Sequence, residues 1–290
     1  MTSSTLVSAQ ALAQILAEGA LEDDLLVVDC RFDLADPSRG AREHARAHVR
    51  GAAFADLNSD LSDLRKAGLG RHPLPDAADF SRVLSRWGWS RDMRVVAYDE
   101  AGGALAAARL WWMLGLAGAT RVAVLDGGLK AWLDAGYPLS DAPSSRAATA
   151  VSVEFDARRI VYTEELQKSG AASVLLDARA APRYRGENET IDPVAGHVPG
   201  ATNRPFATNL QADGCFKSAA DLRVEFERLL AGASPANVVH MCGSGVTACH
   251  NLLAMEHAGL HGSRVYAPSW SGWIADSSRP VATGAVDAAR

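Results

Sequence analysis

The sequence predicts an α/β protein made of two tandem domains, each a mainly parallel sheet flanked by helices. Three observations support this fold class: the length of the chain, a repeated order of segments, and short apolar runs that alternate with longer amphipathic ones. The chain has 290 residues, of which 48% are hydrophobic and 22% are charged. Because a typical domain holds about 100–200 residues, this length favours two domains, each large enough to bury a full core.

A repeat relates the two halves of the chain. Four pairs of segments occur in the same order: VVDCR and LLDAR, HVRGAAF and HVPGATN, VVAYDEAGG and VVHMCGSGV, and GGLKAWLDAGYPL and SWSGWIADSSRPV. Equivalent positions lie 141 residues (132 to 273) to 149 residues (48 to 197) apart. A small, polar stretch without apolar periodicity separates the copies and is typical of a linker. We therefore predict a first domain over 1–140, a linker over 141–152 and a second domain over 153–290.

Strands and helices alternate within each copy. Short β-branched runs predict strands over 25–30, 94–99, 121–126, 173–178, 237–242 and 264–268. Apolar residues at i, i+3, i+4 spacing, followed by glycine, predict helices over 8–19, 77–88, 104–118, 219–232 and 246–259. This alternation predicts a sheet covered on both faces, and ligands of such folds bind at the carboxyl ends of the strands.

The composition points to small-molecule chemistry. The net charge is −5 and the pI is near 5.9, so no nucleic-acid partner is expected. The most apolar stretch, 101–119, contains Arg109 and several glycines and is too interrupted for a membrane span. The N-terminal residues lack a basic leader, so we expect no signal peptide. Four cysteines without a CxxC pair predict reduced thiols and a cytoplasmic protein.

The chemistry concentrates in the loop that follows the predicted strand 237–242. Cys242 ends this strand, and glycines at 243 and 245 precede the next helix. A cysteine in that position lies among backbone N–H groups at the positive end of a helix dipole, which favours a nucleophilic thiolate. The alternative is that Cys242 is a small buried hydrophobe, as most free cysteines are. Asp99 occupies the equivalent place in the first copy, so only the second copy has the nucleophile.

The duplicated unit, the CGSGVTA loop and the HVPGA segment resemble the tandem-domain rhodanese superfamily of sulfurtransferases, over essentially the whole chain. The loop is most similar to the 3-mercaptopyruvate branch, whereas the thiosulfate branch typically has basic residues directly after the cysteine. The resemblance implies that Cys242 takes sulfur from 3-mercaptopyruvate as a persulfide and passes it to a thiol or cyanide, without a metal or organic cofactor. It also implies a thioredoxin-like reductant as a candidate partner. The loop residues that it places at the substrate are Gly243, Gly245, Val246 and Thr247.

The same resemblance assigns residues to the carboxylate of the donor. Arg183 matches the arginine that holds this carboxylate, and Arg185 lies nearby. Arginine suits the task because its planar fork binds a carboxylate through two hydrogen bonds. The alternative is a solvated pair of arginines in the polar loop RYRGENETIDP. A second carboxylate-binding arginine of some family members is missing here, and the region around Asp192 is shorter and acidic.

Three further residues match a group that moves protons. Ser244 matches a loop serine that works with a histidine and an aspartate of the first domain, and His72 and Asp56 occupy the corresponding positions. We therefore expect residues 48–76 to lie over the loop at Cys242. The alternatives are a surface-loop histidine and an aspartate that caps a helix or a turn.

Several other residues are predicted to be structural because they recur in both copies or lack a helix-start context. Cys215, in the loop DGCFKS, is instead a candidate oxidisable thiol. The predicted structural residues are Asp29 with Arg31, Asp177 with Arg179, Trp132, Trp273, Cys30 and Cys249.

Four rival functions remain to be weighed. A cysteine phosphatase or arsenate reductase needs an arginine at the far end of the loop, where this chain has Ala248. A non-catalytic binding module would not need Cys242. A thiosulfate sulfurtransferase shares the reaction type and is the principal alternative. A metal site is disfavoured because its candidate ligands lack tight spacing; these are His240, Cys242, Cys249, His250 and His257.

Overall fold

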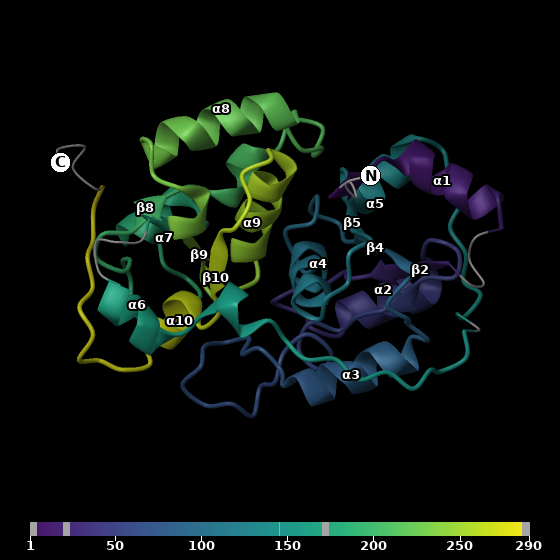
Figure 1. Cartoon of the computed structure of the whole chain (residues 1–290), viewed down its shortest axis with the longest axis horizontal. Coiled ribbons are helices and arrows are strands. Elements are labelled where there is room, and N and C mark those ends of the chain that lie inside the picture. Colours follow the sequence, from purple (N-terminus) through teal and green to yellow (C-terminus); the bar gives the residue numbers. More distant parts are fainter. Residues whose placement is uncertain (1–4, 20–23, 145, 170–173, 286–290) are drawn as a thin grey trace. The chain divides into compact units, whose positions relative to one another are not determined.

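The computed structural model describes residues 5–19, 24–144, 146–169 and 174–285 (Figure 1). The chain divides into two compact units, and each unit includes a short segment from the other half of the sequence. The first unit comprises Met1–Asp63, Pro75–Ala157 and Leu210–Phe216. The second unit comprises Leu64–Leu74, Arg158–Asn209 and Lys217–Arg290.

The first unit is a parallel five-stranded sheet with the order β1-β5-β4-β2-β3. Its strands are β1 (Leu6–Val7), β2 (Leu25–Asp29), β3 (Ala53–Phe54), β4 (Arg94–Tyr98) and β5 (Val122–Leu125). Its helices are α1 (Ala9–Ala17), α2 (Arg39–Arg46), α3 (Ala77–Arg86), α4 (Ala107–Leu116) and α5 (Gly128–Asp134).

The second unit repeats this topology with the order β6-β10-β9-β7-β8, again all parallel. Its strands are β6 (Ile160–Val161), β7 (Val174–Asp177), β8 (Thr202–Asn203), β9 (Val238–Met241) and β10 (Arg264–Tyr266). Its helices are α6 (Thr163–Ser169), α7 (Ala181–Arg185), α8 (Ala219–Leu230), α9 (Ala248–His257) and α10 (Ser269–Trp273). Short 3-10 turns lie at Ala157–Arg159, Phe206–Asn209 and Pro235–Asn237. The predicted fold class is confirmed.

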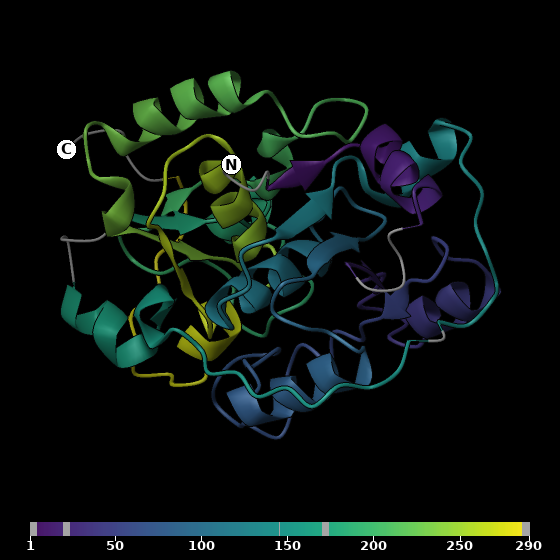
Figure 2. The same ribbon diagram turned by 45° about the vertical axis from the view of Figure 1, so that its right-hand side comes forward.

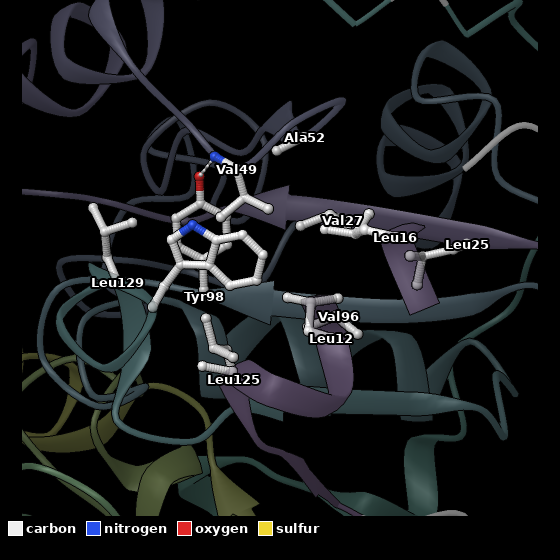
Figure 3. Packing of buried hydrophobic residues seen from close by; sticks show 12 residues of the cluster. Leu12, Leu16, Leu25, Val27, Val49, Ala52, Val96, Tyr98, Leu125 and Leu129 are labelled. Carbon is white, nitrogen blue, oxygen red and sulfur yellow. Dashed lines mark hydrogen bonds between the residues drawn. The ribbon is translucent and has the colours of Figure 1, made fainter. Parts of the chain in front are cut away.

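The core of the first unit lies on one face of its sheet. Side chains at alternate positions of β2 and β4 point to this face, because successive residues of a strand face opposite sides. Figure 3 shows Tyr98 among these residues, with its hydroxyl accepting a hydrogen bond from the backbone N–H of Val49 at 3.1 Å. Helices α1 and α5 complete the cluster, which includes Leu12, Leu16, Leu25, Val27, Val96, Leu125, Leu129 and Trp132.

Helices cover both faces of the second sheet (Figures 1 and 2). Helix α9 packs on β9 and β10, and α8 packs on α9. Residues of α6, α7 and α10 form the core on the other face with Val239, Met241 and Tyr266 of the strands. The loop between β9 and α9 therefore starts at the carboxyl end of a central strand, where parallel folds place their ligands.

The predicted structural residues take equivalent positions in both units. The guanidinium of Arg31 binds the Asp29 carboxylate at 2.6 Å, and that of Arg179 binds Asp177 at 2.7 Å. Both pairs are buried. The indole N–H of Trp132 donates to the carbonyl of Pro138 as that of Trp273 donates to Pro280. The predictions of structural ion pairs, of tryptophans in the core and of a buried thiol at Cys249 are confirmed, and the thiol of Cys30 is buried as well.

Short or polar elements escaped the sequence analysis. Strands β1, β3, β6 and β8 have two residues each, too few to show a periodicity. Helix α2 has the sequence RGAREHAR, with no large apolar residue to mark a buried face. The predicted linker packs on the first unit, since the N–H of Thr149 donates to Ser85 O at 3.0 Å and the N–H of Val151 to Ser85 Oγ at 3.3 Å. Among the described residues, no helix is long and apolar enough to cross a membrane.

Candidate active site

Cys242 follows β9 directly and is 2% exposed. The backbone N–H of Gly245 donates to its Sγ atom at 3.2 Å, so the loop curls around the sulfur. Gly245 has a φ of +78°, a value that glycine adopts at little cost and that closes this turn. Helix α9 begins at Ala248 rather than at the predicted residue 246, which leaves a longer loop in front of the helix.

Helix α10 fixes the backbone of the cysteine loop. The hydroxyl of Ser269 accepts the N–H of Cys242 at 3.1 Å and donates to Tyr266 O at 3.0 Å. The N–H of Trp270 donates to Cys242 O at 3.0 Å, and that of Ser271 to Gly243 O at 2.9 Å. Ser269 has a φ of +52°, a strained value for a residue with a side chain.

The sequence analysis missed Ser269, although the repeat contains a signal for it. The N–H of Leu129 donates to Asp99 O as that of Trp270 donates to Cys242 O, so the residues that precede these donors, Gly128 and Ser269, are equivalent. Gly128 has a φ of +59°. Glycine adopts this backbone conformation at little cost, whereas serine is strained in it. A serine at this position therefore indicates that its hydroxyl group is needed there.

The equivalent loop of the first unit surrounds a carboxyl group. The Asp99 carboxylate is fully buried and accepts five backbone N–H groups at 2.8 to 3.1 Å. Burial raises the pKa of this carboxyl group, and the N–H donors oppose that rise. The loop therefore surrounds an acceptor with N–H groups in the copy without the cysteine. The five donors belong to Ala101, Gly103, Leu105, Ala106 and Ala107.

His72 and Ser244 lie together within the second unit, to which segment Leu64–Leu74 belongs. Their Nδ1 and Oγ atoms are 2.8 Å apart, and both side chains are buried. Asp56 belongs to the first unit, where its carboxylate accepts the N–H groups of Asn58 and Ser59 and so caps a turn.

Two arginines and a carboxylate lie beside Gly243. Asp192 accepts Arg71 Nη1 at 2.5 Å through Oδ1 and Arg183 Nη2 at 2.8 Å through Oδ2. The side chains of Asp192 and Glu189 are 2% and 3% exposed, and Glu189 also binds Arg183. A methyl group built on Gly243 would lie 3.1 Å from Arg71 Nη2 and 3.7 Å from both Arg183 Nη2 and Asp192 Oδ2. The sequence analysis missed Arg71, although it is adjacent to His72.

The remaining candidate residues take different positions. Arg183 and Arg185 lie on α7 and not in a polar loop as expected, because a helical turn begins at Ala181 with Pro182 as its second residue. Arg185 binds the exposed Glu187 at 2.7 Å. In the cysteine loop, Val246 is buried and Thr247 is half-buried.

The other cysteines and histidines have structural surroundings. His250 is buried and lies 3.1 Å from Asn209 Nδ2. Within the described parts of the chain, no group of three or more His, Cys, Asp or Glu side chains is placed to hold a metal ion. Cys215 is half-buried, and burial followed by the nearby carboxylates of Asp126 and Asp213 raises its pKa to about 11. Because a high pKa keeps the thiol protonated, it disfavours the oxidation for which the sequence makes Cys215 a candidate.

Comparison with known proteins identifies the family. A family model for the rhodanese-like domain matches residues 8–135 and again 162–276. The chain belongs to the rhodanese family. The resemblance seen in the repeat and in the CGSGVTA loop is thereby confirmed.

Relatives of this rhodanese-family chain are named as sulfurtransferases. It is 49% identical over 288 residues to the "Probable 3-mercaptopyruvate sulfurtransferase" of Pseudomonas aeruginosa. The alignment covers 98% of this chain and 100% of the relative. It is 33% identical to the thiosulfate sulfurtransferase of Cricetulus griseus, over 93% of this chain and 91% of the relative. The solved 3-mercaptopyruvate sulfurtransferase from Leishmania major superposes with a TM-score of 0.81 at 31% identity, over 92% of this chain and 73% of that chain.

Proposed function

We propose that this rhodanese-family protein is a sulfurtransferase that moves a sulfane sulfur from 3-mercaptopyruvate, through a persulfide on Cys242, to a thiol or cyanide. The observation that carries the proposal is the juxtaposition at Gly243: the residue after the cysteine lies beside guanidinium groups that suit a carboxylate donor. The 49% identity to a relative named for this activity supports it.

The first half-reaction needs a thiolate and a proton transfer. The Cys242 thiolate attacks the sulfur of 3-mercaptopyruvate, so that an S–S bond forms while the C–S bond of the donor breaks. The electron pair of the C–S bond passes to the carbon as the enolate of pyruvate. The proton of the donor thiol then moves to this carbon, which releases pyruvate and leaves the persulfide anion on Cys242.

The second half-reaction restores the enzyme. A thiolate or cyanide attacks the outer sulfur, the S–S bond breaks, and its electron pair returns to Cys242 as the thiolate. A thioredoxin-like reductant is a candidate thiol acceptor. The chemistry requires no oxidant, metal or organic cofactor, and a thiolate enzyme suits the reducing cytoplasm predicted from the cysteine pattern.

Ser244 and His72 are the proposed route for the proton. Their contact of 2.8 Å gives a hydroxyl and an imidazole in hydrogen-bond reach of each other, beside the loop that holds Cys242. His72 accepts or returns the proton through Nδ1, and Ser244 relays it. Asp56 as the third member of this group stays a prediction, since its carboxylate caps its own turn.

The donor is the point on which two functions divide. Arg183 is the proposed ligand of the mercaptopyruvate carboxylate, and the uncharged residues Gly243 and Ser244 bring no cation to the loop for thiosulfate. Thiosulfate remains the alternative donor because relatives named for it cover nearly the whole chain. Arg183 is favoured over Arg185 as this ligand because Arg183 Nη2 lies 3.7 Å from the methyl position of Gly243, whereas Arg185 binds the exposed Glu187.

Steady-state rates and mass spectrometry test the proposal. The unmodified enzyme should give a higher kcat/KM with 3-mercaptopyruvate than with thiosulfate. Donor-treated protein should carry one added sulfur on the peptide with Cys242, and Cys242→Ser should abolish both turnover and the added mass. Equal or better turnover of thiosulfate would assign the other donor, and sulfur on Cys249 or Cys215 in place of Cys242 would refute the persulfide assignment.

A further inference from the structure

Arg71 is held beside the cysteine loop by close backbone packing. Its N–H donates to Ser271 Oγ at 2.9 Å, and the N–H of Ser271 donates to Gly243 O at 2.9 Å. Gly70 has a φ of +95°, and a methyl group on it would lie 2.5 Å from Pro268 O. Glycine at this position therefore lets the segment approach α10, and Ser271 places Arg71 and Gly243 together.

Asp192 is bound as a ligand carboxylate would be. Each of its oxygens accepts a hydrogen bond from a different guanidinium, one from Arg71 and one from Arg183, and the side chain is 2% exposed. Its Oδ2 atom lies 3.7 Å from the methyl position of Gly243. Among the described residues, Arg71 Nε is buried without a hydrogen-bond partner, so this arginine has donor capacity that Asp192 does not use.

We propose that Arg71 and Arg183 together bind the carboxylate of the sulfur donor, and that the Asp192 carboxylate competes with the donor for these two arginines. The inference rests on the proposed function for the identity of the donor. The carboxylates of Asp192 and mercaptopyruvate have the same charge and shape, so they compete for the same two guanidinium groups. The exchange leaves neither arginine unpaired, because one carboxylate replaces the other.

The local charge balance explains why Asp192 is needed. Two guanidinium groups that are 26% and 19% exposed would otherwise lie unneutralised beside Gly243 of the cysteine loop. Asp192 and Glu189 neutralise them. Glu189 lies in the loop that follows α7 and binds Arg183. The Glu189 carboxylate also accepts the N–H groups of residues 191 and 192, so it is fixed and holds Arg183 in place. Arg71 reaches Asp192 from a segment 121 residues away in the sequence.

The inference predicts opposite effects of two substitutions on carboxylate binding. Arg71→Ala should weaken pyruvate binding and raise the KM for 3-mercaptopyruvate by roughly 10- to 150-fold, the value of a charged hydrogen bond. Asp192→Asn should tighten pyruvate binding by about 10-fold if the Asp192-bound state holds about nine tenths of the molecules. Mercaptoacetone, which has a methyl group in place of the carboxylate, should show the same KM in all variants.

The test combines calorimetric titration with pyruvate and steady-state rates with 3-mercaptopyruvate and mercaptoacetone. Arg223→Ala, which removes an exposed arginine paired with Glu227 on α8, is the matched control. Arg71→Lys keeps the charge without the planar fork and carries the test if Arg71→Ala does not fold. Equal losses with both donors in the Arg71 variants would refute the carboxylate role of Arg71. Weaker pyruvate binding in Asp192→Asn would show that Asp192 supports the arginines and does not compete with the donor.

Pyruvate binding also separates this inference from the proposed function. An unmodified enzyme that turns over neither 3-mercaptopyruvate nor thiosulfate would refute the sulfurtransferase proposal. Pyruvate bound by that enzyme and lost in Arg71→Ala would still support the carboxylate site. An unmodified enzyme that turns over 3-mercaptopyruvate but whose affinity for pyruvate is the same in Arg71→Ala would overturn the inference alone.

Discussion

Replacing Arg183 with alanine removes a guanidinium on which two buried carboxylates depend. Arg183 Nη2 binds Asp192 at 2.8 Å and Glu189 at 2.9 Å, and these carboxylate side chains are 2% and 3% exposed. Breaking a buried ion pair by removing one partner costs about 3–5 kcal/mol. Asp192 keeps Arg71 and Glu189 keeps two backbone N–H groups, so we expect a loss of about 2–3 kcal/mol at neutral pH.

The loss of stability should depend on pH through Glu189. Burial raises the pKa of Glu189, but Arg183 and two backbone N–H groups outweigh it and hold the pKa below its ordinary value. A carboxyl group whose pKa is lower in the folded state stabilises the fold above its unfolded pKa of about 4.3, and this contribution is lost as the pH falls through the folded pKa. The difference in unfolding free energy between Arg183→Ala and the unmodified protein should therefore be largest at neutral pH and shrink below about pH 4.

Urea denaturation at pH 7 and at acidic pH measures the stability, and initial rates below the unfolding transition measure the activity. The kcat/KM for 3-mercaptopyruvate should fall roughly 10- to 150-fold, mainly through KM, if Arg183 holds the donor carboxylate. Arg185→Ala, two residues along α7, should leave the stability unchanged because it removes only the pair with the exposed Glu187. A stability loss independent of pH, or an unchanged KM, would refute this reasoning.

Three further predictions follow from single contacts. Gly243→Ala should raise the KM for 3-mercaptopyruvate about 5- to 150-fold and spare mercaptoacetone, because its methyl group crowds Arg71 at 3.1 Å; equal effects on both donors would contradict it. Asp99→Asn should lower the unfolding free energy by about 2–4 kcal/mol in urea melts, since its amide N–H₂ would face N–H donors. An unfolding free energy equal to that of the unmodified protein would contradict the role of Asp99 as a buried acceptor of these N–H groups. Cys215 should react several hundredfold more slowly with iodoacetamide at pH 8 than a free cysteine, because a pKa of about 11 leaves about one thiolate in a thousand; labelling as fast as that of glutathione would contradict the raised pKa.

Local patterns in the sequence were sufficient to predict the sheet and the position of Cys242 at the end of a central strand. Strands β2, β4, β5, β7, β9 and β10 are continuous apolar runs because a parallel sheet buries both faces, and such runs are visible without a structure. The repeat located Cys242 and Asp99 at equivalent strand ends, since both copies fold under the same topology. The strand–cysteine–glycine order depends only on neighbours in the chain, so the sequence contains it completely.

Tertiary structure decided which residues surround Cys242, although the family resemblance had already paired His72 with Ser244. Arg71 and His72 lie in the first half of the sequence, yet they belong to the second unit, where Arg71 meets Asp192 and His72 meets Ser244. The repeat relates equivalent positions of the two copies, but no local periodicity predicts a contact such as that between Arg71 and Asp192, which are 121 residues apart. The loop after α7 contains no arginine of its own, and the guanidinium of Arg71 that binds Asp192 leaves no mark on the sequence of that loop. Local propensities act over a few residues, whereas a binding site is set by contacts that form only after the chain has packed.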